Sequence, residues 1–261
     1  MSSPPPTEPE YEVVSLPCSR PLVWLGRGWW DLMRCPLPGL AHGLAAALFG
    51  GALIWLGRGH FWFLAGAFSG FLLVAPLLAT GLYAISRSLA HGRQATLATA
   101  LAAWRPRDAR LVRFGLLLAL AGTGWVLTSA SLITRFAGAP VHSPLDFLRV
   151  VVLAGSDNHL FEAWLVLGSV LAAPIFASSV VAIPMLLDRP HGVLTAVTTS
   201  IAAALSNPAA MALWATIILA LTLLGMATLM VGMVVVLPWL AHSSWHAYRD
   251  LVRTRPIGAR R

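Results

Sequence analysis

The sequence predicts an all-α fold, a polytopic membrane helix bundle whose six transmembrane helices form three hairpins, each preceded by a cytoplasmic amphipathic helix in the membrane interface. Three observations predict it. Hydrophobic residues make up 57% of the 261 residues and charged residues only 11%, with a mean hydropathy of +0.75, whereas soluble domains carry about 25% charged residues. Apolar stretches recur at the length of a membrane span. The arginines are distributed unevenly among the segments between these stretches.

Five apolar stretches reach the roughly 20 residues that a bilayer core about 30 Å thick requires. Four of them predict one span each, at 38–57, 61–86, 114–133 and 163–187. The fifth covers 208–241 without a charged residue and would be about 50 Å long as a single helix. Because that exceeds the bilayer core unless the helix tilts steeply, we predict two spans, 209–226 and 229–247, with a turn between Gly225 and Gly232.

The arginines favour six spans over five. All 18 basic residues are arginine, against 10 acidic ones. Six spans place fifteen of the arginines on the side that holds both termini and leave only Arg58, Arg135 and Arg149 on the other, whereas five spans divide them more evenly. Since arginines collect in cytoplasmic loops, we expect both termini to be cytoplasmic, in the cytoplasmic (inner) membrane of a bacterium. The net charge of +8 is then a signal of topology, and we expect no nucleic-acid partner.

The two ends of the chain predict no folded structure of their own. We expect a disordered tail over 1–19, a membrane domain over 20–252 and a basic tail over 253–261. The first residues are polar and contain glutamates, so they do not have the basic start and apolar run of a secretory signal. Cys18 and Cys35 lack metal-binding spacing and are too few for a disulfide framework.

Three cytoplasmic segments share one pattern, a short amphipathic helix that ends at a residue–proline pair and leads into a span. The pairs are Cys35-Pro36, Arg105-Pro106 and Asn207-Pro208. In the first segment, Arg20, Arg27 and Arg34 recur every seven residues and form one stripe. We expect this helix to lie in the interface, where each arginine attracts anionic lipid of the cytoplasmic face by about 1 kcal/mol. A specific protein partner is the alternative.

Catalytic patterns are absent from the sequence. It contains no paired carboxylates, glycine-rich phosphate loop or nucleophile–base arrangement, so we expect no enzymatic activity, and it identifies no cofactor. The predicted spans contain no Asp, Glu, Lys or Arg, which counts against an ion-coupled transporter. A transporter of apolar molecules, or a lipid-handling protein with a central cavity, stays open as an alternative.

Three histidines are the candidate metal ligands. His242 and His246 lie four residues apart on one face of the last predicted span, and His42 lies at a similar depth in the first. Such spacing is compatible with a metal ion or haem iron, although histidines at an interface are also ordinary anchoring residues. Gly39 and Gly43 form a small-xxx-small pair that predicts close helix packing.

Two segments resemble a known family. They are the run Leu237-Pro238-Trp239-Leu240-Ala241-His242-Ser243-Ser244-Trp245-His246-Ala247-Tyr248-Arg249-Asp250-Leu251 and, before the first span, Gly28-Trp29-Trp30-Asp31-Leu32. This pattern resembles the bacterial integral membrane proteins of the domain of unknown function 2189 family, over about residues 20–252. Ala241 stands where that family prefers glycine. Some members carry the label of cytochrome c oxidase subunits, which the resemblance passes on as a hint. The lack of charged residues in the spans and of catalytic patterns, beside the anchoring and packing features, predicts an accessory subunit of a membrane (respiratory) complex. Its binding partner would be a membrane partner or a second copy of the chain.

Overall fold

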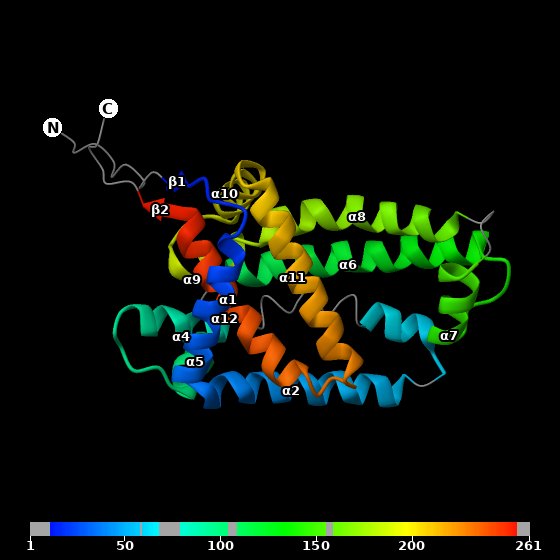
Figure 1. Ribbon diagram of the computed structural model, residues 1–261, viewed down its shortest axis with the longest axis horizontal. Coiled ribbons are helices and arrows are strands. Elements are labelled where there is room, and N and C mark those ends of the chain that lie inside the picture. Colours follow the sequence, from blue (N-terminus) through cyan, green and yellow to red (C-terminus); the bar gives the residue numbers. More distant parts are fainter. Residues whose placement is uncertain (1–10, 58, 68–78, 104–108, 155–158, 255–261) are drawn as a thin grey trace.

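The structure, a computed structural model, describes residues 11–57, 59–67, 79–103, 109–154 and 159–254. Most of the described residues are helical (Figure 1). Its elements are β1 (Tyr11–Val13), α1 (Arg20–Arg34), α2 (Pro36–Leu56), α4 (Thr80–Ala90), α5 (Leu97–Ala103), α6 (Ala109–Phe136), α7 (Pro144–Phe147), the π-helix η1 (Leu148–Val152), α8 (Leu160–Ser179), α9 (Ala182–Asp188), α10 (Val193–Ser206), α11 (Pro208–Ala227), α12 (Met233–Leu251) and β2 (Val252–Thr254).

Within the described ranges, four helical segments are long and apolar enough to cross a membrane. They are Pro36–Leu56, Ala109–Phe136, Leu160–Asp188, which combines α8 and α9, and Pro208–Ala227. They correspond to the spans predicted at 38–57, 114–133, 163–187 and 209–226. The span predicted at 61–86 includes residues 68–78, which lie outside the described residues. The span predicted at 229–247 corresponds to α12, which is helical but is not one of the four. An all-α membrane bundle is therefore what the structure supports.

The chain turns where the apolar stretch over 208–241 was expected to turn. Helix α11 ends at Ala227 and α12 begins at Met233. Two residues of the turn, Leu229 and Met230, adopt positive φ angles of 52° and 70°, a conformation that costs roughly 1–2 kcal/mol per residue. The hydroxyl of Thr228 accepts a hydrogen bond from the Gly232 amide at 2.8 Å, which helps to hold this turn.

Two of the residue–proline junctions have the same backbone conformation. Cys35, between α1 and α2, has φ −139° and ψ 64°, and Asn207, between α10 and α11, has φ −134° and ψ 49°. In both cases the proline is the first residue of the next helix, where it needs no amide hydrogen. Both junctions thus match the predicted repeat. The third, at 105–106, lies outside the described residues.

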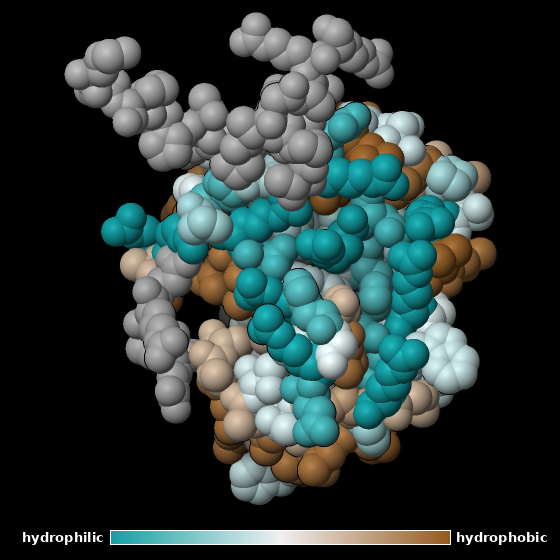
Figure 2. Space-filling model, turned by 90° about the vertical axis from the view of Figure 1, so that its left-hand side faces the viewer, coloured by the Kyte–Doolittle hydropathy of each residue, from teal (hydrophilic) through white to brown (hydrophobic). Residues whose placement is uncertain are grey.

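The two ends of the molecule differ in character (Figure 1). Helices α4, α9 and α10 and the strands gather at one end, which we call the arginine-rich end because its acidic residues bind Arg20, Arg27, Arg87, Arg189 and Arg249. Figure 2 looks onto this end and shows hydrophilic side chains over its middle and hydrophobic ones along its rim. Helices α7 and η1 lie at the opposite end, which we call the α7 end, beside a small apolar cluster around Ile133, Val141, Val151 and Leu160.

The main core lies towards the arginine-rich end. Its largest fully buried side chains include Trp24, Trp214, Trp245 and Tyr248. Trp24 of α1 meets Trp214 of α11 edge to face, with ring centroids 5.7 Å apart, a geometry that favours aromatic pairs. One face of α1 is therefore buried in protein, so α1 does more than rest on the membrane surface.

The expected tails are partly structured. Strands β1 and β2 pair antiparallel, with Tyr11 opposite Thr254 and Val13 opposite Val252. Asn207, only 3% exposed, fixes the segment after β1, because its side chain accepts from the Leu16 amide at 2.7 Å and donates to the Val14 carbonyl at 3.0 Å. The disorder expected over 1–19 is thus wrong for Tyr11–Val13, and the expected C-terminal tail begins with a strand. Residues 1–10 and 255–261 lie outside the described residues.

Candidate functional site: a buried histidine cluster

Glycines bring α1 and α2 close to α12, the helix that carries His242 and His246. A methyl group added to Gly43 of α2 would lie 2.1 Å from the Val234 carbonyl oxygen, and one added to Gly28 of α1 would lie 2.6 Å from the Ser243 amide nitrogen. Real side chains do not tolerate such contacts with backbone atoms. The close packing expected at Gly43 is present, and it encloses the polar residues of α12 between α1, α2 and α4.

His242 lies at the centre of the enclosed cluster. Its side chain is fully buried, and its Nδ1 atom lies 2.7 Å from the hydroxyl oxygen of Ser86 on α4. Its Nε2 atom has no hydrogen-bond partner in the part of the chain that the structure describes. His42 lies near enough for the charges of the two rings to interact. The charge of His246 also acts on His242, so the three predicted histidines lie in one cluster.

His246 and Asp31 form the second part of the cluster. The Nε2 atom of His246 lies 2.8 Å from Asp31 Oδ2, and both side chains are largely buried. Burial acts to raise the pKa of the Asp31 carboxyl, but hydrogen bonds from His246 and Ser86, together with the charge of His246, outweigh it and hold the pKa below its ordinary value. Asp31 is therefore an ionised acceptor at neutral pH.

Two further hydrogen bonds order the histidine rings in this cluster. Ser86 and His242 share one hydrogen bond at 2.7 Å, in which either the hydroxyl or Nδ1 can be the donor. In His42, Nδ1 donates to the Pro38 carbonyl at 2.7 Å, because a carbonyl only accepts. The contacts of Asp31 with His246 and of His242 with Ser86 thus hold the cluster together.

The arrangement does not form a catalytic triad. Ser86 and His242 are both fully buried, so Ser86 does not meet a substrate from solvent. Asp31 contacts Ser86 and His246 but does not orient His242 through its second ring nitrogen, as a triad requires. The cluster therefore resembles a buried polar network that fixes the positions of three helices.

The metal site stays a prediction. Among the residues that the structure describes, no group of three or more His, Cys, Asp or Glu side chains is placed to hold a metal ion. The Nε2 atoms of His42 and His242 are the ring nitrogens that could bind such an ion, since His246 is already bound to Asp31. Metal analysis and absorbance spectra of the purified protein test it directly, and a blank result would reject it.

Two aspartates next to the cluster bind arginines. Asp250, at the end of α12, accepts from Arg20 Nε at 2.6 Å, Trp24 Nε1 at 3.0 Å and Arg27 Nη1 at 3.1 Å. Two of the three arginines in the stripe of α1 therefore bind protein, although the sequence predicted lipid contacts for all three. Burial acts to raise the pKa of Asp250, but the hydrogen bonds from Arg20 and Trp24 and the charges of Arg27 and Arg20 hold it below its ordinary value.

Asp188, at the end of α9, binds four side chains. It lies 3.0 Å from Arg87 Nε, 3.6 Å from Arg189 Nε and 3.4 Å from Arg249 Nη1, and it accepts from the Tyr248 hydroxyl at 2.8 Å. These contacts join α4, α9 and α12. The guanidinium group of Arg189 also lies over the ring of Tyr11, 4.6 Å from its centroid, so β1 is tied to the same group of charges.

Sequence reasoning missed Asp31 and Ser86. The sequence does contain a signal for Asp31. It is the only acidic residue between Glu12 and Asp108, and it lies seven residues after Trp24, on the same face of the helix. Ser86 carried none, because a single serine in an apolar helix has no pattern.

Replacing Ser86 with alanine is expected to destabilise the protein. The change leaves the buried Nδ1 of His242 without its partner, which costs about 1–3 kcal/mol for a buried polar group. Ser88→Ala, on the same helix but only partly buried, is the control. We expect the melting temperature in detergent to fall for Ser86→Ala alone. Equal stability of the two variants would contradict the described network.

Acid is expected to remove the stabilisation that Asp250 supplies. Its pKa in the folded protein is lower than its ordinary value of 3.8, so its contribution is complete above that value and is lost as the pH falls through the lower, folded value. Asp250→Asn should therefore be less stable than wild type at pH 7, and the difference should shrink below about pH 4. Melting temperatures across pH 3–7 test this, and a difference independent of pH would contradict it.

A known family matches part of the chain. Residues 63–188 match the family described as predicted integral membrane protein (DUF2189), which is the family that the sequence resembles. The matched segment contains Ser86, Arg87 and Asp188, whereas the two segments that suggested the family, at 28–32 and 237–251, lie outside it. No curated protein and no solved structure matches the chain.

Proposed function

We propose that this protein, whose residues 63–188 match a family of predicted integral membrane proteins, is a non-enzymatic subunit of a larger complex in the cytoplasmic membrane of a bacterium. Its six spans place both termini in the cytoplasm. The observation that carries the proposal is how little the membrane helices bury against each other. In each of the four apolar helices, between 17% and 33% of the most apolar 18-residue segment is buried within the chain.

The uncovered surface is concentrated on particular helices. On α2 the side chains of Leu48, Trp55 and Leu56 are 66%, 64% and 65% exposed, and on α11 those of Leu219 and Leu223 are 58% and 56% exposed. Apolar side chains in lipid gain little from mere burial, so helices associate through van der Waals contacts between fitted surfaces. These faces offer such surfaces to another membrane protein, and lipid covers what the partner leaves.

The polar groups support a structural role over a catalytic one. Asp31, Asp188 and Asp250 are each bound by side chains of the same chain. The buried histidine, His242, uses its Nδ1 atom for the contact with Ser86. Charge pairs and hydrogen bonds of this kind fix the register of packed helices.

Charges at the two ends support the six-span topology. Arg20 meets Asp250 and Arg87 meets Asp188 at the arginine-rich end, although each pair joins distant parts of the sequence. The topology assigns all four residues to the cytoplasm. The topology assigns Arg135 to the opposite side of the membrane. Arg135 stands in the last turn of α6, near the α7 end. Six crossings of the membrane by the chain are compatible with this separation of the arginines between the two ends of the molecule.

Site-specific photo-crosslinking in intact cells tests the proposal. A benzophenone amino acid replaces Leu219 or Leu223 on α11, and Leu194 on α10, which is 75% exposed at the arginine-rich end, serves as the control. We expect one discrete heterologous product from the two α11 positions, present at fixed stoichiometry when the protein is extracted in mild detergent. Only monomer, or only a product of two copies of this chain, would overturn the subunit proposal.

A further inference from the structure

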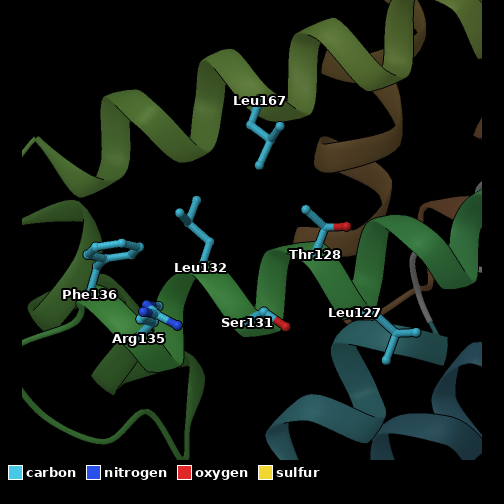
Figure 3. Close-up of a pocket in the computed structure, with 7 residues that line it drawn as sticks. All are labelled: Leu127, Thr128, Ser131, Leu132, Arg135, Phe136 and Leu167. Carbon is cyan, nitrogen blue, oxygen red and sulfur yellow. The ribbon is translucent and has the colours of Figure 1, made fainter.

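An open groove lies along α6, on the side that Leu167 of α8 borders, near the α7 end of the molecule (Figure 3). The groove has a volume of about 450 Å³, which lies within the range of ligand pockets in proteins. The residues that line it are Leu127, Thr128, Ser131, Leu132, Arg135 and Phe136 of α6 and Leu167 of α8. Its lining is mostly apolar, and the Thr128 hydroxyl is already bound to the Gly124 carbonyl at 2.7 Å.

Among the residues that the structure describes, Arg135 is the single charged one in this lining. It stands in the last turn of α6 and forms no ion pair with any residue that the structure describes. Two described acidic residues near it in the chain are used elsewhere. Asp146 accepts from the His142 amide, and Glu162 lies 4.0 Å from His159. Positive charge is therefore available at one end of an apolar groove.

The groove extends from the level of the lipid headgroups into the hydrocarbon. Leu127 lies eight residues before Arg135, which is about 12 Å along a helix, or nearly half of a bilayer core about 30 Å thick. Its apolar part is thus at the depth of acyl chains and its charge is at the end of the span. This polarity matches an amphiphile that has an anionic head and an apolar chain.

We propose that the groove binds one anionic phospholipid, with the phosphate on Arg135 and one acyl chain against Leu127, Leu132 and Leu167. Charge complementarity favours this occupant over a neutral lipid. That the lipid comes from the outer leaflet rests on the proposed topology, whereas the binding itself does not.

Native mass spectrometry of the protein in nanodiscs tests this site. The discs contain phosphatidylcholine with a minor fraction of phosphatidylglycerol, and the measured quantity is the phosphatidylglycerol retained per chain. We expect the wild type to retain one such lipid and Arg135→Gln to bind it about fivefold to tenfold more weakly. Arg149→Gln, which removes an exposed arginine outside the groove, is the matched control and should retain it.

A second variant tests the apolar part. Leu167→Trp fills the groove without changing the charge and should also lose the lipid, with an unchanged melting temperature as evidence of folding. Equal retention of phosphatidylglycerol by wild type, Arg135→Gln and Leu167→Trp would overturn the proposal. So would equal retention of phosphatidylcholine, or displacement of the lipid by a partner helix crosslinked to the groove. None of these outcomes depends on whether the chain is a subunit.

Discussion

Gly43→Ala is expected to lower the melting temperature of the protein in detergent by roughly 2–12 °C, because overpacking reduces the free energy of unfolding by about 1–3 kcal/mol. The added methyl group would lie 2.1 Å from the carbonyl oxygen and 2.6 Å from the carbonyl carbon of Val234. Both are backbone atoms of α12, so no side-chain rotation relieves the clash. The two helices must separate, and the contacts around His242 loosen with them.

A second glycine of α2 provides the control for this prediction. Gly51 lies in the same helix, and a methyl group added there meets no atom within 4 Å. Gly51→Ala should be neutral or slightly stabilising, because alanine favours a helix over glycine by about 1 kcal/mol. Thermal unfolding followed by tryptophan fluorescence compares the two variants. Similar melting temperatures for both would mean that α2 and α12 do not approach each other as described.

Asp188→Asn is expected to destabilise the arginine-rich end. Asparagine keeps the size of the side chain but removes the charge that Arg87, Arg189 and Arg249 share. Removing one partner of a buried ion pair costs about 3–5 kcal/mol, but the side chains of Arg87 and Arg249 are 45% and 47% exposed, and solvent screens them. We therefore expect the free energy of unfolding to fall by about 2 kcal/mol, which is within the range for losing a buried acceptor of charged hydrogen bonds.

Limited proteolysis and thermal unfolding measure this effect. Faster cleavage near β1 and β2 should accompany the lower melting temperature, because Arg189 also contacts the ring of Tyr11. Glu162→Gln removes a carboxylate that is 66% exposed and lies 4.0 Å from His159, and should leave both measurements unchanged. If Asp188→Asn matched this control, the ion-pair cluster would not stabilise the fold.

Local signals predicted much of the fold. Apolar length predicted α2, α6, α8 and α11, since a span is defined by composition over about 20 residues. Residue–proline pairs predicted where α1 and α10 end, because proline lacks an amide hydrogen and restricts the residue before it. The pair Gly39 and Gly43 predicted close packing, which the structure shows at both positions.

Contacts between distant residues escaped prediction. Ser86 and His242 are 156 residues apart in the sequence, and Arg20 and Asp250 are 230 apart. No local pattern pairs them, because they meet only after α1, α4 and α12 have packed. The same reason applies to α1, whose arginine stripe was interpreted as a lipid-facing surface. The strand pair of Tyr11–Val13 with Val252–Thr254 likewise needs both ends of the chain at one place.

Paired topology reporters test the central claim, a six-span membrane protein with both termini in the cytoplasm. Green fluorescent protein, which is fluorescent in the cytoplasm, and alkaline phosphatase, which is active only outside it, are fused in turn after Arg261 and within the loop at Gly138, between α6 and α7. The six-span account predicts fluorescence but no phosphatase activity at Arg261, and the reverse at Gly138. Phosphatase activity at Arg261, or fluorescence at Gly138, would contradict it.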